Sequence, residues 1–327
     1  MNRPIVCTSI AATLCATLAF ASTQAMAAKP GGGGSTPCTT AVGFPAFAYW
    51  KPAGNTIEIL VADATGKCVR SVIKSSGTGG TIQFSYPVDG TSNRGRIAWV
   101  AAPSVVSVDF TVDAVTRQIT VFAKKTIYSG TGGFISLSKN GSALYSTRYS
   151  GSGAPVIDRI QLDAVGSPAG VPTLVLQAPA ASNLQTISVN GDETVIFADY
   201  KPIAGASVYK LVWILLTDPN TYHEIDSDNS SNSWEFSPAA DPSSSRVAYQ
   251  KYSVTSSGCD LLVTSDVNGQ PTYPQQSAYG VKPTWLNGMI LADGRTATCS
   301  YTGTIMQTDP ISGLQVALTS GYDPDGK

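Results

Sequence analysis

The sequence predicts an all-β protein, a six-bladed β-propeller of four-stranded antiparallel blades, and three observations lead to this fold. A strand that ends in Asp and a short turn recurs about every fifty residues. A second turn, built on Asx-Gly, precedes most copies and keeps the same phase. The first unit lacks its own first strand, and a matching segment stands at the other end of the sequence.

The recurring strand and turn set the period. The element reads EILVADATG, DFTVDAVT, DRIQLDAVG, VWILLTDPNT, DLLVTSDVNG and TIMQTDPISG, with turn aspartates Asp63, Asp113, Asp163, Asp218, Asp266 and Asp309. Successive aspartates are 50, 50, 55, 48 and 43 residues apart. Asp accepts the amide hydrogens of such turns, whereas calcium needs six to eight oxygens per ion. We therefore interpret these six residues as structural turn residues.

The second turn divides each unit into two hairpins. It is found at Asp89-Gly90, Asn140-Gly141, Asn190-Gly191 and Asn287-Gly288, and the longer PAADPSSS replaces it in the fifth unit. The apolar strands RIAWV, ALYST, VIFAD, RVAYQ and MILAD follow these turns. Each unit then reads as strands A, B, C and D, with turns A–B and C–D and a B–C loop. Four strands repeated six times fit a six-bladed propeller.

The first unit explains how the ring closes. FPAFAYW, residues 44–50, aligns with strand B, and the missing strand A with its Asx-Gly turn is found as GYDPDG near residue 325. Blade 1 is therefore expected to combine both ends of the chain, which removes two open sheet edges. The predicted propeller covers residues 38–327, with blades at 44–74 plus 320–327, 82–128, 133–177, 184–226, 233–275 and 282–319.

Two of these segments also resemble a known family. YDPDGK and the split FSP…RVAYQ resemble the W-S-P-D-G-K-x-I-A-F repeat of TolB-type, WD40-like (PD40) propellers, and the resemblance covers roughly residues 40–327. Most units lack the Trp-Ser-Pro lead-in, and Asn often replaces Asp. TolB carries a further α/β domain before its propeller, with no counterpart in this sequence. The resemblance therefore implies the fold and not membership of the Tol system.

The N-terminal region predicts export. Residues 1–27 read as a signal peptide, with Arg3, an apolar stretch from Ile10 to Ala21, and the small-x-small sequence Ala25-Met26-Ala27 before the cleavage point. Residues 28–37 form a Gly-rich flexible linker. No convincing lipobox precedes Cys15 or Cys38. We expect a periplasmic or secreted monomer without a membrane span.

Composition and cysteines limit the ligands. Only 13% of residues are charged and the net charge is −1, which argues against nucleic-acid binding. Four cysteines follow the signal peptide and allow three pairings. The assignment of loops to faces selects Cys38–Cys68 on one face and Cys259–Cys299 on the other. Without a CxxC or Cys/His cluster we expect neither a metal nor another cofactor.

The end of strand B suggests a binding surface on the face that carries the B–C and D–A loops. Five of the six blades place a cation there and four add an aromatic residue: Trp50, Lys51, Arg148, Tyr149, Tyr200, Lys201, Lys251, Tyr252 and Arg295. This set, called the rim below, could hold an anionic or carbohydrate-like ligand by charge-assisted hydrogen bonds and stacking. The same long side chains could also merely cover strand ends.

Three function classes follow from this pattern. The preferred prediction is an exported, non-enzymatic propeller that binds a protein, peptide or glycan partner on the B–C face. The alternative is a hydrolase or lyase that uses rim carboxylates such as Asp199 or Asp293, with or without a divalent cation in the central channel. The third is a purely structural surface protein. Catalysis has little support, because the single histidine, His223, stands alone and no G-x-S-x-G motif is present.

Overall fold

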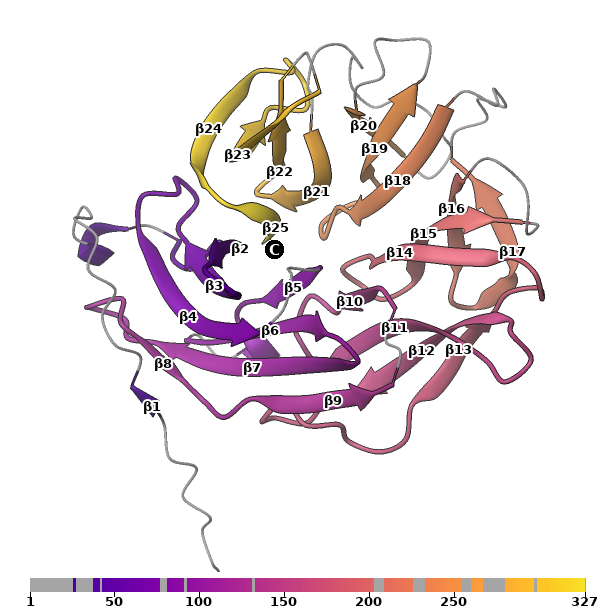
Figure 1. Ribbon diagram of the computed structural model, residues 1–327, viewed down its shortest axis with the longest axis horizontal. Coiled ribbons are helices and arrows are strands. Elements are labelled where there is room, and N and C mark those ends of the chain that lie inside the picture. The colour runs from indigo at the N-terminus through magenta and orange to yellow at the C-terminus, as the bar shows by residue number, and fades with distance from the viewer. Residues whose placement is uncertain are drawn as a thin grey trace, which may run out of the picture.

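Six antiparallel sheets stand around a common centre in the computed structural model (Figure 1). The structure describes residues 26–27, 38–41, 43–76, 81–90, 93–130, 133–202, 209–225, 233–253, 260–266, 280–296 and 299–326. The strands of blades 3 to 6 follow one another in sequence order from the centre outwards. In blade 1 the C-terminal strand is innermost, and in blade 2 the N-terminal β1 is added outside β8. The predicted six-bladed propeller is confirmed.

The strands of the first three blades have the following bounds. Blade 1 contains β25 (Tyr322–Gly326), β2 (Phe47–Ala53), β3 (Thr56–Ala62) and β4 (Val69–Ser76). Blade 2 contains β5 (Ile82–Ser85), β6 (Arg94–Ala101), β7 (Ser104–Val112), β8 (Ile119–Val121) and β9 (Lys125–Ser129), and both β8 and β9 pair with β7. The short β1 (Met26–Ala27) pairs with β8. Blade 3 contains β10 (Ile135–Leu137), β11 (Ala143–Tyr149), β12 (Pro155–Gln161) and β13 (Thr173–Gln177).

The remaining blades complete the ring. Blade 4 contains β14 (Asn183–Val189), β15 (Val195–Lys201), β16 (Lys210–Leu215) and β17 (Asp218–Glu224). In the described part of blade 5 the strands are β18 (Ser233–Ala240), β19 (Val247–Ser253) and β20 (Asp260–Ser265). Blade 6 contains β21 (Gly280–Leu286), β22 (Met289–Arg295), β23 (Tyr301–Thr308) and β24 (Gln315–Ser320). Among the described residues the helical segments are the short 3-10 turns η1 (Cys38–Thr40) and η2 (Val88–Gly90).

The ring closes as predicted, although one detail of the prediction is wrong. Strand β25 pairs with β2, with Phe47 opposite Gly326 and Trp50 opposite Tyr322. In Figure 1 the yellow β25 ends at the centre of the ring beside the indigo β2. Asp325 and Gly326 lie inside this strand and not in the Asx-Gly turn expected from their sequence. The Asp325 carboxylate instead accepts a hydrogen bond from Phe84 N of blade 2, at 2.5 Å.

The hydrophobic core is divided among the six junctions between neighbouring blades. Each of the six buried clusters combines residues of two adjacent blades. At the junction of blades 4 and 5, for example, Phe197 and Leu211 pack against Val247 and Tyr249. Alternate residues of the strands therefore face the neighbouring blades on either side, as expected when both faces of a sheet are covered.

Polar side chains join the innermost strands. In five of the six junctions a backbone N–H of one inner strand donates to a side chain of the preceding inner strand: Phe84 to Asp325, Leu137 to Gln83, Val189 to Ser136, Ala240 to Ser188 and Gly326 to Thr284. Between blades 5 and 6, the indole of Trp285 donates to the carbonyl of Ala239 at 2.9 Å. The inner strands have no further strand on that side, and these contacts satisfy N–H groups that would otherwise be buried without partners.

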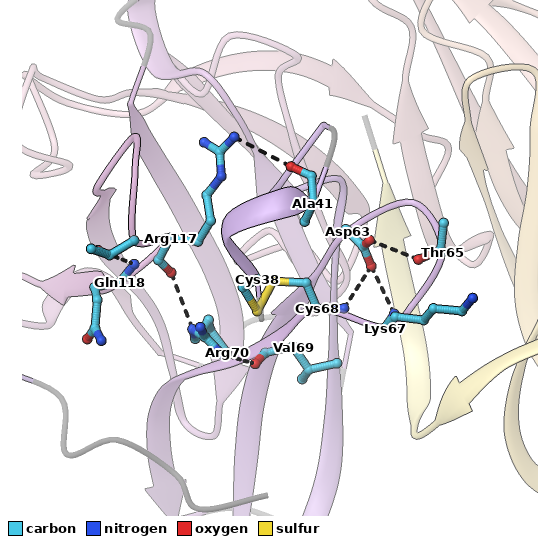
Figure 2. Close-up of a disulfide and its surroundings, with 11 residues drawn as sticks. Cys38, Ala41, Asp63, Thr65, Lys67, Cys68, Val69, Arg70, Arg117 and Gln118 are labelled. Carbon is cyan, nitrogen blue, oxygen red and sulfur yellow. Dashed lines mark hydrogen bonds between the residues drawn. A yellow bond between two sulfur atoms is a disulfide. The ribbon is translucent and has the colours of Figure 1, made fainter. Parts of the chain in front are cut away.

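A disulfide fixes the beginning of the propeller. Cys38 in η1 is bonded to Cys68, which precedes β4, with 5.0 Å between their Cα atoms. Figure 2 shows this disulfide beside the Asp63 turn and close to Arg117 of blade 2, whose side chain donates to the carbonyl of Ala41. The predicted Cys38–Cys68 pair is thus confirmed. Across the described residues, no helix is long and apolar enough to cross a membrane.

Candidate functional site

A central cavity runs between the innermost strands of the blades. Its volume is about 470 Å³, and its walls come from β5, β10, β14, β18, β21 and β25. Each inner strand begins at the loop from the preceding blade, on the B–C face, and ends at an A–B turn on the opposite face. The cavity volume lies within the range of small-ligand sites, about 300–1,000 Å³.

Three residues near the B–C end of the cavity share an uncommon backbone conformation. Ser237, Lys282 and Asp323 each have a φ of 52°, and each precedes a proline. They come from three consecutive blades, and in each blade the inner strand is interrupted there by a β-bulge. All three line the central cavity, and we call them the mouth residues. Non-glycine residues at positive φ cost about 1–3 kcal/mol each and cluster at functional sites.

Two of the mouth residues carry opposite charges. The ammonium of Lys282 is 3.5 Å from Oδ2 of Asp323, and the Lys282 side chain is 43% exposed whereas that of Asp323 is 7% exposed. Asp323 also donates its backbone N–H to Oδ1 of Asp293 on β22, at 2.5 Å. Lys282 therefore reaches solvent at the mouth, and the two carboxylates lie behind it.

The carboxylates of this cluster are electrostatically strained. Burial, and then the charge of Asp323, raise the pKa of Asp293 to about 7. Burial also raises the pKa of Asp323, against the opposing effect of Lys282. The positive charges of Lys282 and Arg295 lower the pKa of Asp293 by less than burial and Asp323 raise it. Such perturbed groups beside a cavity mark a candidate functional site.

A further carboxylate, that of Asp199, forms a hydrogen bond with a mouth residue. Asp199 on β15 accepts hydrogen bonds from the hydroxyl of Thr186 and from the backbone N–H of Ser237, the latter at 3.2 Å. Asp199 and Asp293 thus both accept the N–H of a mouth residue of the following blade. This shared role gives Asp199 and Asp293 a structural function, because each holds a bulge in place.

Three of the rim cations make contacts within the protein. Arg148 forms an ion pair with Asp158 on β12, and its Nη2 donates to Oδ1 at 3.1 Å. The ammonium of Lys201 lies 5.5 Å from the centre of the Tyr209 ring. The guanidinium of Arg295 lies 3.7 Å from the centre of the Tyr301 ring. These contacts fix the cations in position and reduce their capacity to act as independent anion sites.

The aromatic rim residues are partly stacked. Trp50 stacks on Tyr322 at 5.1 Å, and Tyr200 stacks on Tyr222 at 4.6 Å. Tyr149 is 59% exposed, and its hydroxyl donates to Asn183 at 2.8 Å. The other rim residues are half-buried on strand B of blades 1 and 5: Lys51, Lys251 and Tyr252.

The rim residues do not form a single cluster of direct contacts in the described part of the chain. The junction of blades 3 and 4 is the best connected part. There Asn183 accepts from Tyr149 and donates to Tyr209 at 2.8 Å, and Lys201 lies over the Tyr209 ring. This chain of contacts puts Tyr149 and Lys201 on one local surface beside the B–C end of β14.

The predicted turn aspartates lie mainly in C–D turns. Asp63, Asp113, Asp163 and Asp309 each accept hydrogen bonds from backbone N–H groups two to five residues further on. Asp266 directly follows β20. Asp218 differs, because it is the first residue of β17, after a turn at Leu216 and Thr217, and it accepts from the Thr221 hydroxyl at 2.7 Å.

Cys299 is disulfide-bonded in the blade 6 B–C loop, and Cys259 lies outside the described residues. The second pairing therefore stays a prediction.

The mouth residues were missed by the sequence analysis, although a signal was present. Ser237-Pro238, Lys282-Pro283 and Asp323-Pro324 each place a proline inside an expected strand A. Proline is confined to edges and bulges of sheets, so a repeated X-Pro in strand A indicates a bulge beside the channel. The described residues contain no group of three or more His, Cys, Asp or Glu side chains that could hold a metal ion.

The fold is shared with solved propellers. No protein-family model and no curated protein matches the chain. TolB from Acinetobacter baumannii has a TM-score of 0.59 and 12% identity, with 86% of this chain and 65% of that chain covered. The Pseudomonas aeruginosa periplasmic gluconolactonase PpgL has a TM-score of 0.50 and 10% identity, with 86% and 97% covered. An oligogalacturonate lyase in complex with manganese has a TM-score of 0.50 and 12% identity, with 81% and 71% covered.

These similarities concern the fold. The chain has a TolB-like propeller fold and spans 65% of the length of that TolB chain. At identities of 10–12% the neighbours include TolB as well as a lactonase and a lyase. A propeller hosts many unrelated functions, so function has to be argued from the site.

Proposed function

We propose that this protein is an exported, non-enzymatic propeller that binds a protein, peptide or glycan partner on its B–C face, with part of the partner entering the central cavity. The observation that carries the proposal is the set of mouth residues, Ser237, Lys282 and Asp323, at the B–C end of a cavity of about 470 Å³. A hydroxyl, an ammonium and a carboxylate there offer donors and acceptors of both charge signs. An extended peptide segment with polar side chains suits this mixture best.

In this proposal the rim acts mainly by holding its side chains in a fixed arrangement for the partner, and less by supplying charge. The ion pair of Arg148 with Asp158, and the stacking of Lys201 and Arg295 on tyrosines, hold long side chains in one arrangement before a partner arrives. Preorganised side chains lose less conformational entropy on binding. Exposed aromatic groups such as Tyr149 then supply apolar contact area around the mouth.

An envelope or extracellular location is part of the proposal. The N-terminal sequence has the features of a signal peptide. The Cys38–Cys68 disulfide and the disulfide-bonded Cys299 suit an oxidising compartment. One of the similar solved structures, PpgL, is a periplasmic protein.

Site-specific photo-crosslinking in the native host tests the binding proposal. A photoreactive residue replaces Tyr149 on the B–C face, and a matched control replaces Ile311, which is 64% exposed in the turn between β23 and β24 on the opposite face. We expect a discrete crosslinked partner from position 149 and none from position 311. The crosslink should be lost in Lys282→Ala, which alters the mouth without touching position 149. Equal crosslinking from both positions, or a crosslink that survives Lys282→Ala, would contradict the proposal.

The catalytic alternative rests on one specific observation, the pKa of Asp293 near 7. A group with that pKa could exchange protons at neutral pH. However, the carboxylates that line the cavity are those of Asp323 and Asp325, and Asp293 lies behind the backbone of Asp323. Turnover of gluconolactone or oligogalacturonate, lost in Asp323→Asn, would favour this alternative. Absence of turnover by the folded protein with both substrates would leave the binding function.

A further inference from the structure

A second pocket lies on the A–B face, at the junction of blades 4 and 5. Its volume is about 410 Å³, and it lies between the turn from β14 to β15 and the turn from β18 to β19. It adjoins the central cavity at Gly191 and Pro242, and its other lining residues belong to it alone. It is on the face opposite the mouth residues and has no part in the function proposed above.

One wall of this pocket is apolar and aromatic. Val195 and Phe197 on β15 are paired with Leu215 and Trp213 on β16, so these four side chains share one side of the blade. Trp213 is half-buried, and its indole is stacked on the imidazole of His223 at 4.0 Å with an interplanar angle of 13°. The stack holds the indole in one orientation.

The other wall presents hydrogen-bond acceptors. The Thr194 hydroxyl donates to Asp192 at 2.6 Å, and the hydroxyls of Ser243 and Ser244 donate to Asp241 at 2.8 and 2.7 Å. A hydroxyl has one proton to donate and two lone pairs that accept. These three protons are used inside the protein. Ser244 also accepts from the backbone N–H and the Nε of Arg246, and Thr194 accepts from the Asn190 amide. The acceptors that remain for a ligand are therefore chiefly the lone pairs of Ser243 and one lone pair of Thr194. Asp192 adds a carboxylate whose pKa is lowered, chiefly by the Thr194 hydroxyl.

The two turns that form the pocket are held against each other. A Cβ at Gly191 would lie 2.1 Å from the carbonyl oxygen of Pro242, so only glycine allows this approach. Asn190 accepts the N–H groups of Thr194 and Val195, both at 2.9 Å. The pocket is therefore formed before any ligand binds, which lowers the entropic cost of binding.

We propose that this pocket binds a neutral saccharide, with the C–H face of a sugar ring against Trp213 and the sugar hydroxyls donating to the acceptor wall. A ligand with an apolar face and a set of hydroxyl donors matches both walls. Among the described lining residues the only ionic side chain is that of Asp192. An anionic ligand would lack a cationic partner, and the carboxylate of Asp192 would repel it.

Titration of the whole protein with small neutral sugars tests the proposal. The probes are cellobiose, maltose, N-acetylglucosamine and methyl galactoside, followed by saturation-transfer NMR and calorimetry. We expect binding of at least one probe, weakened about tenfold in Trp213→Leu because an aromatic contact is lost. Asp192→Ala should weaken the same probe about fivefold through loss of a charge-assisted acceptor.

Two control variants locate the binding. Asp113→Ala removes an equally exposed turn aspartate that also accepts from a threonine, in blade 2, and should leave sugar affinity unchanged. Lys282→Ala alters the central cavity and should also leave it unchanged. The proposal is overturned if no probe binds, if Trp213→Leu and Asp192→Ala bind the sugar as well as the parent protein, or if tetramethylammonium binds more tightly than every neutral sugar.

Discussion

Two buried charge clusters in the described part of the ring, at the junctions of blades 2 and 3 and of blades 6 and 1, are built in opposite ways. At the first, the fully buried Arg96 donates to both carboxylate oxygens of Asp109 at 2.7 and 2.9 Å. The same guanidinium reaches the carbonyls of Gly141 and Asp163 at 2.5 and 3.2 Å. At the second, Asp323 donates its backbone N–H to Asp293, and Lys282 lies 3.5 Å from Asp323. The charges of Lys282 and Arg295 offset only part of the effect of burial on Asp293.

This difference separates a structural cluster from one that can respond to a ligand. The donors of Arg96 are directed at groups of blades 2 and 3, so the cluster fixes the position of one blade on the next. In the second cluster, beside the central cavity, burial disfavours the charged form of Asp293 and raises its pKa to about 7. A charged group entering the mouth would change the protonation of the second cluster and leave the first unaffected.

The largest expected effect is the removal of Arg96. In Arg96→Ala, Asp109 retains only Arg94 as a cationic partner, and the carbonyls of Gly141 and Asp163 lose their donor. Breaking one partner of a buried ion pair costs about 3–5 kcal/mol, and we expect this decrease in the free energy of unfolding. Denaturation in urea measures it. Arg96→Lys should recover part of the loss, since lysine keeps the charge but not the planar fork. A loss below about 1 kcal/mol in Arg96→Ala would show that the cluster does not hold the blades.

The second cluster should make stability depend on pH. The pKa of Asp293 is raised to about 7 in the folded protein, against about 3.9 in an unfolded chain. The folded state therefore holds the proton more tightly, so the contribution of Asp293 to stability is greatest below about pH 4 and declines as the pH rises towards 7. We expect Asp293→Asn to match the parent near pH 4 and to exceed it in free energy of unfolding by about 4 kcal/mol above neutral pH. Denaturation curves across this range measure the difference.

The exposed turn aspartates provide the control for that prediction. Hydrogen bonds from Thr116, first from its backbone and then from its side chain, lower the pKa of Asp113. Its contribution has the opposite sign, because stability from a lowered pKa is present at neutral pH and is lost on acidification. Asp113→Asn should therefore not reproduce the gain above neutral pH. A parallel pH profile for Asp293→Asn and the parent would mean that the second cluster is not strained.

Local turn chemistry made the architecture predictable from the sequence. The aspartates and glycines between strands recur in phase, and a repeat of this kind specifies the number of blades and the pairing of both chain ends. The same inference from local sequence gave a wrong prediction at Asp325-Gly326, which lie inside β25. Its Asp-Gly sequence indicates a turn, but the partners of Asp325 are Phe84 N and the Thr284 hydroxyl, from two other blades. These contacts join neighbouring inner strands whose residues are far apart in the sequence, so no short stretch of sequence reveals them.

The candidate site was less accessible to sequence reasoning for the same reason. The sequence places the strand ends and the rim cations on one face of the propeller. It does not reveal the residues that form ion pairs with these cations, such as Asp158 with Arg148. The mouth residues could be found only by assigning prolines in strand A to bulges that face a common cavity. Sequence periodicity thus locates positions on a face, whereas burial and contacts between blades decide which of them are available to a ligand.

The smallest expected effect concerns the rim ion pair. Arg148 and Asp158 are joined like Arg96 and Asp109, but the Arg148 side chain is 33% exposed whereas that of Arg96 is buried. Water and salt screen an exposed pair, so Arg148→Ala should lower the free energy of unfolding by less than about 1 kcal/mol. Denaturation at low and high salt measures this value, which should shrink as salt increases. A loss as large as that of Arg96→Ala would mean that the rim pair also holds blade 3 together, and Arg148 would then be a structural residue with no part in partner binding.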